Sequence, residues 1–176
     1  MGMVSENSFE SGVRKVIPAV LVYLRQNGKV LMIHRIGRKD GKVDHHLGRW
    51  NGLGGKFEAD ESPLEAARRE IQEEAGITVE ESQFQILGVL QFPNFKAHKS
   101  EDWLVYVLTA DLSEKVTRTE TQEGTLEWVS EGDVMKLNLW PGDRHFIPFV
   151  LERKPFVGTL WYEGSEVKRH WVRTFS

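Results

Sequence analysis

The chain has 176 residues, of which 40% are hydrophobic and 28% are charged, and its formal net charge is −3. These values are close to globular averages and predict one packed domain, and the lack of a basic excess argues against stable binding to nucleic acids or membranes. The absence of cysteine excludes disulfides and thiolate metal sites and fits a reducing, cytoplasmic location.

The N-terminal half begins with a polar segment and then an apolar one. Residues 1–13 lack the apolar core of a signal peptide, so we expect a flexible tail followed by a single domain over residues 14–176. Residues 16–24 and 29–33 are rich in valine, isoleucine and leucine, and Asn27-Gly28 lies between them. Because an Asn-Gly pair readily adopts the positive φ angles of a tight turn, these segments are predicted to form a β-hairpin.

Two loop-like segments follow. Residues 37–48 are polar and rich in glycine and aspartate, so they are predicted to form a loop in which His45 and His46 are solvated. Residues 49–56 contain three glycines around Trp50 and Leu53, a composition that allows the backbone to approach a ligand or another element closely.

A helix is predicted over residues 63–75. Ser62 is a favourable N-cap, Pro63 suits the first helical position, Glu65 completes a capping box, and Gly76 is a typical left-handed terminator. A buried stripe is predicted from four apolar residues at helical spacing: Leu64, Ala67, Ile71 and Ala75.

The rest of the chain mixes extended and helical patterns. Residues 84–92, 103–111 and 126–129 are predicted strands, residues 134–137 a helical turn, residues 141–153 a helix, and residues 157–162 and 167–175 a terminal hairpin. Because there is no regular alternation of strand and helix, the pattern predicts an α+β fold with helices packed on a mixed sheet.

Three glutamates, Glu70, Glu73 and Glu74, lie within about one third of the circumference of the predicted helix. Like charges at these spacings cost about 0.2–0.5 kcal/mol per pair, and negative charge in a last helical turn is also unfavourable. A divalent cation would remove the repulsion, and ligation by oxygen alone favours Mg²⁺ or Mn²⁺ over Zn²⁺. From these residues alone, a solvated acidic surface remains the alternative.

The glutamates are part of a longer pattern, Gly55-x5-Glu61-x7-Arg69-Glu70-Ile71-x-Glu73-Glu74-x-Gly76-Ile77, which resembles the complete Nudix box. The resemblance implies a Nudix fold, an α/β/α sandwich with a mixed sheet, and a Mg²⁺-dependent hydrolase of phosphoanhydride bonds. It also implies that Glu70, Glu73, Glu74 and the carbonyl of Gly55 hold the metal, with Mn²⁺ as a possible substitute. Glu61 and Arg69 would orient these ligands.

Two further segments, Gly48-Arg49-Trp50-Asn51-Gly52 and Leu139-Trp140-Pro141-Gly142-Asp143, are similar to those of the oxidised-purine nucleoside triphosphatases. The resemblance implies that Asn51 and Asp143 hydrogen-bond a purine and that Trp140 stacks on it. Arg35 and Lys56 are expected to contact the substrate. One departure is Gly142, which stands where animal members carry a second acid.

The expected reaction converts a nucleoside triphosphate such as 8-oxo-dGTP or dGTP to the monophosphate and pyrophosphate. Glu74 or Glu123 would accept a proton from the attacking water. Glu123 lies five residues before Trp128, a spacing at which related enzymes carry an acid that completes the metal site or acts as base. A solvated loop residue is the alternative for Glu123.

Other functions remain open from the sequence. The substrate could be ADP-ribose, an RNA 5′ end or a dinucleoside polyphosphate, and Pro93, sixteen residues after Ile77, resembles the ADP-ribose hydrolases in this respect. A non-catalytic nucleotide-binding module is a remoter alternative, because such proteins normally lose the box glutamates. We expect a monomer or a homodimer.

Overall fold

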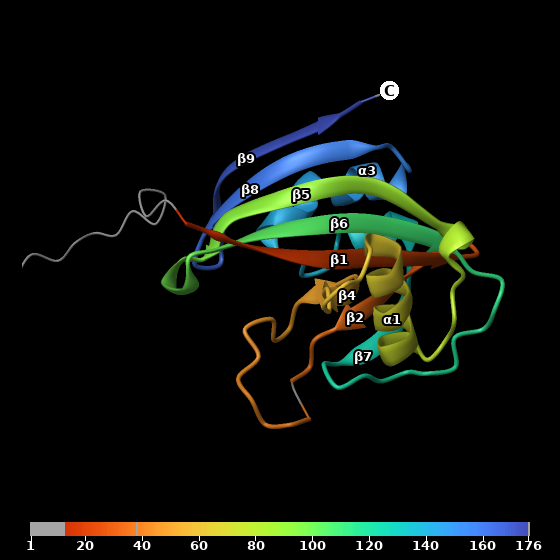
Figure 1. Ribbon diagram of the computed structural model, residues 1–176. Helices are drawn as coiled ribbons and strands as arrows, with labels where there is room; N and C mark the ends of the chain where they lie inside the picture. The colour runs from red at the N-terminus through yellow and green to blue at the C-terminus, as the bar shows by residue number, and fades with distance from the viewer. Residues whose placement is uncertain (1–12, 38, 176) are drawn as a thin grey trace, which may run out of the picture.

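The computed structural model describes residues 13–37 and 39–175, so almost all of the tail predicted over residues 1–13 lies outside the described residues. The described strands form one sheet in the order β3-β2-β1-β6-β5-β8-β9, with β4 paired to β1 and β7 paired to β2. Helix α1 (Pro63–Ala75) lies in front of the sheet and α3 (Ile147–Leu151) lies behind it (Figure 1). The predicted α+β arrangement, with helices on a mixed sheet, is confirmed.

The strands are β1 (Lys15–Gln26), β2 (Lys29–His34), β3 (Trp50–Asn51), β4 (Leu53–Lys56), β5 (Phe84–Lys96), β6 (Glu101–Asp111), β7 (Thr125–Ser130), β8 (Phe156–Glu163) and β9 (Glu166–Thr174). Asn27 and Gly28 adopt φ angles of 51° and 71° between β1 and β2, which confirms the predicted hairpin turn. Strand β5 extends beyond its predicted end because Pro93 lies at an irregularity in the pairing with β6, where a ladder hydrogen bond from its nitrogen is not needed.

Strand β1 is buried on both faces and divides two hydrophobic clusters. Val20, Val22 and Leu24 belong to the cluster beneath α1, whereas Ala19 and Tyr23 belong to the cluster on the opposite face. Successive side chains of a strand point to opposite faces, so a strand covered on both sides carries a continuous apolar run. The central position of β1 follows from this run.

Helix α1 has the predicted bounds and caps. The Ser62 hydroxyl accepts a hydrogen bond of 3.2 Å from the Glu65 backbone N–H, the Glu65 carboxylate accepts one of 2.8 Å from the Ser62 N–H, and Gly76 is left-handed. The buried residues of the helix include Glu74 as well as the predicted Ala67, Ile71 and Ala75. The helix therefore carries one of its acids into the interface with the sheet.

The layer on the other face follows the prediction in one place and differs in another. The turn predicted at residues 134–137 is present, since the Leu137 N–H bonds to the carbonyl of Val134 at 3.2 Å, and it continues the short helix α2 (Glu131–Val134). The helix predicted at residues 141–153 is divided at Phe146 into a 3₁₀ helix, η3 (Pro141–His145), and α3. Pro148 has no N–H with which to continue a helical ladder, so the division has a local cause.

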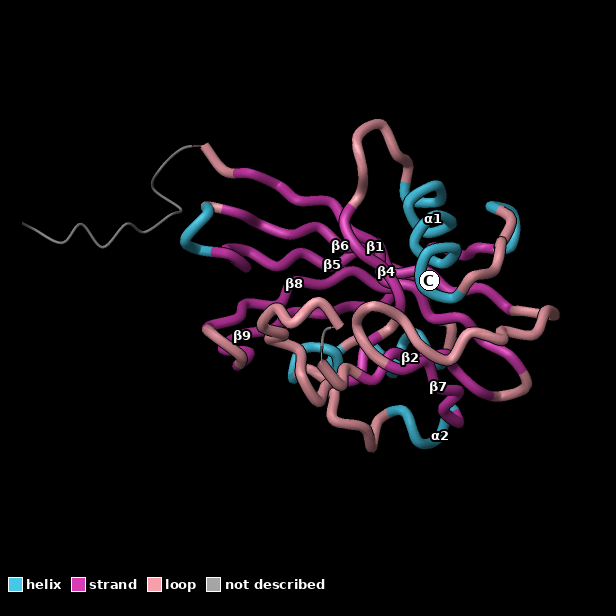
Figure 2. Tube along the Cα trace, turned by 90° about the horizontal axis from the view of Figure 1, so that it is seen from below, coloured by secondary structure: helices cyan, strands magenta, loops and turns pink. Residues whose placement is uncertain are grey.

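Two further short 3₁₀ turns, η1 (Glu81–Gln83) and η2 (Ala97–Lys99), flank strand β5. Figure 2 shows α1 and α2 on opposite sides of the sheet. None of the helices in residues 13–37 and 39–175 has the length and apolar character needed to span a bilayer.

Candidate active site

Two carboxylates of α1 lie against the glycine-rich strand β4. The Glu74 Oε2 atom accepts a hydrogen bond of 2.9 Å from the backbone N–H of Gly54. The Glu70 carboxylate occupies the space into which a Cβ atom on Gly55 would project, and a Cβ atom on Gly54 would overlap the carbonyl of Val20. The absence of side chains in this part of β4 therefore allows the carboxylates of α1 to reach its backbone.

The environment of these carboxylates favours their protonated forms. Burial raises the pKa of Glu74 to about 8, with the hydrogen bond from Gly54 opposing this shift and the negative charges of Glu70 and Glu123 adding to it. Burial also raises the pKa of Glu70, although the neighbouring guanidinium of Arg69 opposes the increase. Glu70, Glu74 and Glu123 are therefore close enough to repel one another, and a bound cation would reverse that effect.

Arg69 connects the other predicted box residues. Its guanidinium donates to both carboxylate oxygens of Glu61 at 2.6 and 3.0 Å, to Glu70 at 2.9 Å and to the carbonyl of Lys56 at 2.9 Å. Such paired contacts fix both orientation and distance. By contrast, the Glu73 carboxylate comes no closer than 3.5 Å to the Arg69 guanidinium, and the Glu73 side chain is 57% exposed. The structure thus brings Glu70 and Glu74 together and leaves Glu73 at the solvent.

Glu123 approaches from a tight turn that immediately precedes β7 and lies beside the end of β2. The N–H groups of Glu123 and Gly124 both donate to the Thr121 hydroxyl, and a Cβ atom on Gly124 would overlap the backbone carbonyl of His34. The Glu123 carboxylate forms an ion pair with Arg35. Arg35 also donates to both oxygens of Asp44, at 3.1 and 3.2 Å, so the loop over residues 37–48 is attached to this side of the site.

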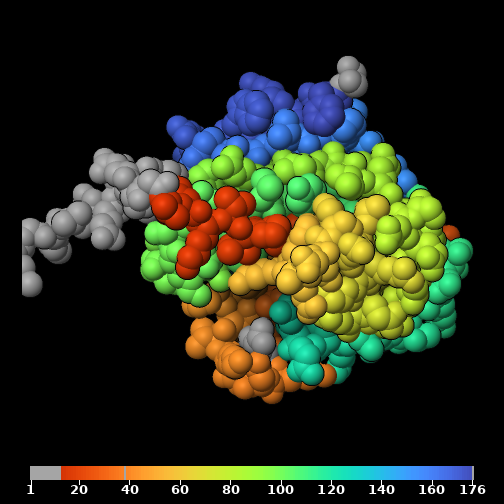
Figure 3. All heavy atoms as spheres, in the orientation of Figure 1, coloured from red at the N-terminus to blue at the C-terminus, as the bar shows by residue number. Residues whose placement is uncertain are grey.

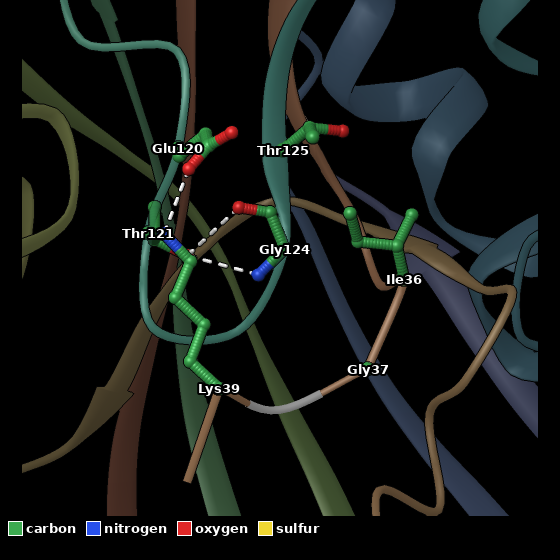
Figure 4. A pocket seen from close by; sticks show the side chains of 7 residues that line it. All are labelled: Ile36, Gly37, Lys39, Glu120, Thr121, Gly124 and Thr125. Carbon is green, nitrogen blue, oxygen red and sulfur yellow. Dashed lines mark hydrogen bonds and ion pairs between the residues drawn. The ribbon is translucent and has the colours of Figure 1, made fainter.

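Two hollows are lined by neighbours of the site residues but not by the site carboxylates themselves. A pocket of about 260 Å³ lies between the loops near residues 37 and 120 (Figure 4) and is lined by Ile36, Gly37, Lys39, Glu120, Thr121, Gly124 and Thr125. The same two segments meet at the surface near α1 in Figure 3. Lys39 and Glu120 join them through an ion pair of 2.7 Å. A shallower hollow of about 620 Å³ lies on the outer side of α1, around Arg68 and Gln72. Neither hollow is lined by Glu70 or Glu74, so the chemistry of the residues defines the candidate site better than cavity size does.

The residues suit a divalent cation in their chemistry. Every atom that could ligate a metal here is an oxygen, and Mg²⁺ prefers oxygen ligands. The negative charges of neighbouring carboxylates raise the pKa values of Glu70 and Glu74, and a cation would offset that repulsion. Within residues 13–37 and 39–175, no group of three or more His, Asp or Glu side chains is already arranged to hold an ion. Glu123 and Glu70 instead contact arginines, so binding would require those two side chains to exchange partners.

The residues predicted to bind a purine are connected through the backbone. Asn51 pairs with Ile33 of β2, while Trp50 forms an isolated bridge with Leu139, the residue before Trp140. The Arg49 guanidinium donates to the Leu139 carbonyl at 2.7 Å. Residues 49–51 and the segment that carries Trp140 are therefore held together, as the predicted purine site requires.

Trp140 is held by side chains on several sides. Its Nε1–H donates to the Nδ1 atom of His46 at 2.8 Å, and the guanidinium of Arg49 lies 4.9 Å from the centre of its ring. The ring of Tyr162 meets it edge-on at 6.1 Å. The prediction that His46 is solvated is therefore wrong, whereas His45 is exposed as predicted.

Asp143 lies in η3 and is 9% exposed. Burial raises its pKa to about 7, although the positive charges of Arg49 and Arg144 oppose the increase. None of the described residues donates a hydrogen bond to its carboxyl group. A bound ligand could therefore donate hydrogen bonds to this carboxyl group.

The two predicted basic substrate contacts lie on different sides of the site. Arg35 is at the carboxylate side, as described above, and the Nζ atom of Lys56 lies 5.2 Å from the centre of the Trp103 ring. The Nζ atom of Lys96, which the sequence did not single out, lies at the same distance from that ring. Two ammonium groups therefore border Trp103.

Comparisons with known proteins agree with this arrangement. Residues 15–150 match the NUDIX domain model. The chain is 31% identical over 147 residues to an oxidized purine nucleoside triphosphate hydrolase from Danio rerio, which covers 84% of this chain and 87% of that protein. It is 30% identical over 119 residues to the mouse protein of the same name, with 68% and 73% covered. A MutT protein structure from Bacillus halodurans superposes with a TM-score of 0.75 at 27% identity, covering 89% of this chain and 97% of that one.

Proposed function

This chain belongs to the NUDIX family, and we propose that it hydrolyses purine nucleoside triphosphates, including oxidised ones such as 8-oxo-dGTP, to the monophosphate and pyrophosphate. It has the Nudix fold and is a Nudix hydrolase that acts on phosphoanhydride bonds. The observation that carries the substrate proposal is the buried Asp143 carboxyl, which has no hydrogen-bond donor among the described residues and lies three positions from Trp140. Relatives whose names specify oxidised purine triphosphates support the same choice.

Nudix hydrolases generally use a divalent metal, usually Mg²⁺. In this chain we assign Glu70, Glu74 and the carbonyl of Gly55 as its ligands, with Glu73 and Glu123 completing the set. The oxygen-only donors and the mutual repulsion of the buried carboxylates support this assignment. When bound, the ion supplies positive charge to the phosphate oxygens and makes water more acidic.

The side chains of the site have distinct roles in hydrolysis. Glu74 Oε2 is engaged by the N–H of Gly54, so its Oε1 atom is available to accept the proton of the attacking water, and Glu123 is the alternative base. The water oxygen forms a bond to phosphorus, the anhydride P–O bond breaks, and pyrophosphate leaves. Arg35 and Lys56 carry positive charges that can bind the polyphosphate. To contact the polyphosphate, Arg35 would have to break its ion pair with Glu123.

The purine edge offers groups that match this site. A carboxylate accepts hydrogen bonds, as Asp143 would from ring and exocyclic N–H groups of a guanine, and the amide of Asn51 can both donate and accept. Trp140 offers an indole face for stacking. The positions of Asp143 and Trp140, in and next to η3, support a single base-binding site.

A nucleotide panel tests this function. We expect kcat/KM for 8-oxo-dGTP and dGTP to exceed that for the pyrimidine triphosphates by at least about tenfold, because a site that pairs polar groups with the base penalises a base that leaves them unpaired. Pyrophosphate, and not phosphate, should be released. Preferential hydrolysis of ADP-ribose, triphosphorylated RNA or a dinucleoside polyphosphate in the same panel would contradict the proposal.

A further inference from the structure

Tyr162, near the end of β8, is bound to the first turn of η3. Its hydroxyl oxygen accepts a hydrogen bond of 2.7 Å from the backbone N–H of Gly142. The first N–H groups of a helical turn have no helical carbonyl to bond, so an acceptor from another element is needed. Tyr162 supplies that acceptor and thereby ties η3 to the sheet.

The contact depends on the absence of a side chain at residue 142. A Cβ atom on Gly142 would overlap the hydroxyl oxygen of Tyr162 and would lie 3.0 Å from two of its ring carbons. The tyrosine hydroxyl and a larger residue at position 142 therefore exclude each other. This explains in steric terms why glycine suits the position between Trp140 and Asp143.

The ring of Tyr162 is itself fixed by aromatic neighbours. Its centre lies 6.1 Å from that of Trp140, 6.2 Å from that of Phe92 and 6.0 Å from that of Phe95. Aromatic pairs at these separations favour defined orientations. Because Phe92 and Phe95 belong to β5, the packing of Tyr162 against them fixes the segment that carries Trp140 and Asp143 relative to the sheet.

Two tyrosine hydroxyls lie near Asp143. The negative charge of Asp143 adds to burial in raising the pKa of Tyr162, and it acts in the same direction on Tyr23 from β1. The Tyr23 hydroxyl is buried and has no hydrogen-bond partner within the described chain. Such groups are rare in native proteins and call for a functional account. Residues of β1 and β8, as well as those of η3, therefore lie around Asp143.

We propose that Tyr162 is a positioning residue of the base site, which acts through Gly142 to set the places of Trp140 and Asp143. The proposal rests on the proposed function, since it assumes that these two residues meet the base. Tyr162 contacts the backbone of η3 and none of the carboxylates that we assign to the metal, so we expect it to affect binding of the purine and not the hydrolytic step. Its removal should raise KM for purine triphosphates and leave kcat and the KM for pyrimidine triphosphates little changed.

A double-mutant cycle at Tyr162 and Gly142 tests the proposal. Tyr162→Phe removes one neutral hydrogen bond and should raise KM for dGTP about 3- to 10-fold, with kcat within about twofold of wild type. Gly142→Ala should raise it more, because the Cβ atom displaces the hydroxyl. Tyr162→Phe combined with Gly142→Ala should be no worse than Gly142→Ala alone, since the overlapping oxygen is gone, and this non-additivity is the signature of direct coupling.

A matched control is Tyr106→Phe, which removes a hydroxyl on the α1 face of β6, beside Phe57, where we place no substrate. It should leave both KM and kcat unchanged. The proposal is overturned if Tyr162→Phe behaves like the control, if its effect is on kcat, if it is equal for purines and pyrimidines, or if the two substitutions are additive.

The proposed function can fail separately. If the wild-type protein hydrolyses no purine triphosphate, that function is wrong, and the same cycle is then measured as the dissociation constant of a non-hydrolysable dGTP analogue. Coupling between residues 142 and 162 in that constant supports the positioning role. Equal affinities of all variants, or no binding of the analogue by any of them, overturn it.

Discussion

The Glu74 carboxylate and the Gly54 N–H are joined by a hydrogen bond of 2.9 Å, although Glu74 is 9% exposed and lies in the last turn of α1. A negative charge at that end of a helix is unfavourable, and burial adds to the cost. Gly54 offsets part of this cost from another strand. The protein thus keeps an electrostatically unfavourable carboxylate at the junction of α1 and β4, where our account places catalysis.

Replacing Glu74 by glutamine should lower kcat by at least about 100-fold, because the variant loses a metal ligand or a base. The fold should persist, since glutamine retains the shape of the side chain and an oxygen that can accept from Gly54. The exposed Glu152 provides the control, and Glu152→Gln should be as active as wild type. Near-full turnover by Glu74→Gln, measured as pyrophosphate release, would refute this role.

Gly55→Ala should weaken metal dependence. The new Cβ atom would collide with the Glu70 carboxylate, so we expect the Mg²⁺ concentration for half-maximal activity to rise about 10-fold or more, the scale found when ligand orientation is disturbed. Gly132→Ala in α2 is a matched control, because nothing lies within 4 Å of a Cβ atom there. An unchanged Mg²⁺ requirement in Gly55→Ala would argue that Glu70 is not a ligand.

His46 and His45 form a natural pair for testing the role of the loop. Burial lowers the pKa of His46, which keeps its Nδ1 atom unprotonated and able to accept from Trp140. His46→Ala should raise KM for dGTP about 3- to 10-fold through loss of this bond. His45→Ala, at the exposed neighbour, should have no effect. Equal KM values for the two variants would show that the bond does not position Trp140.

Asp143 should make stability depend on pH. Its pKa is raised from 3.8 to about 7 by folding, so the folded state binds the proton more tightly than the unfolded state. The stabilising contribution is fully present below about pH 4 and is lost as the pH rises through about 7. Asp143→Asn has no titrating carboxyl group, so its stability does not fall with rising pH for this reason. Its unfolding free energy relative to wild type should therefore increase by about 2–3 kcal/mol between pH 5 and pH 8.

Urea unfolding at the two pH values measures this difference. The exposed Asp133 is the control, and the corresponding difference for Asp133→Asn should not vary with pH. A constant difference for Asp143→Asn as well would mean that the carboxyl is not held in a protonated state by burial.

The sequence predicted those parts of the fold whose signals are local. Ser62, Pro63, Glu65 and Gly76 determine the ends of α1 within its own segment, and Asn27-Gly28 determines the first turn in the same way. Pro148 is also a local signal, because its missing N–H disfavours one continuous helix over residues 141–153.

The site was predicted less completely because its decisive contacts join distant segments. His46 and Trp140 are 94 residues apart, and nothing in their neighbours indicates that they share a hydrogen bond. Helical spacing placed Glu70, Glu73 and Glu74 on one side of α1 but could not show which of them β4 covers. That depends on tertiary packing, which buries Glu74 and leaves Glu73 exposed.

The central claim is that Glu70 and Glu74, packed against Gly54 and Gly55, bind a divalent cation. Titration of the nucleotide-free protein with Mn²⁺, followed by electron paramagnetic resonance of the free ion, measures this directly. We predict that the wild type binds Mn²⁺ and that replacing both glutamates by glutamine weakens binding at least about 10-fold. Equal Mn²⁺ affinity of the wild type and the double variant, or no binding by the wild type, would contradict the account.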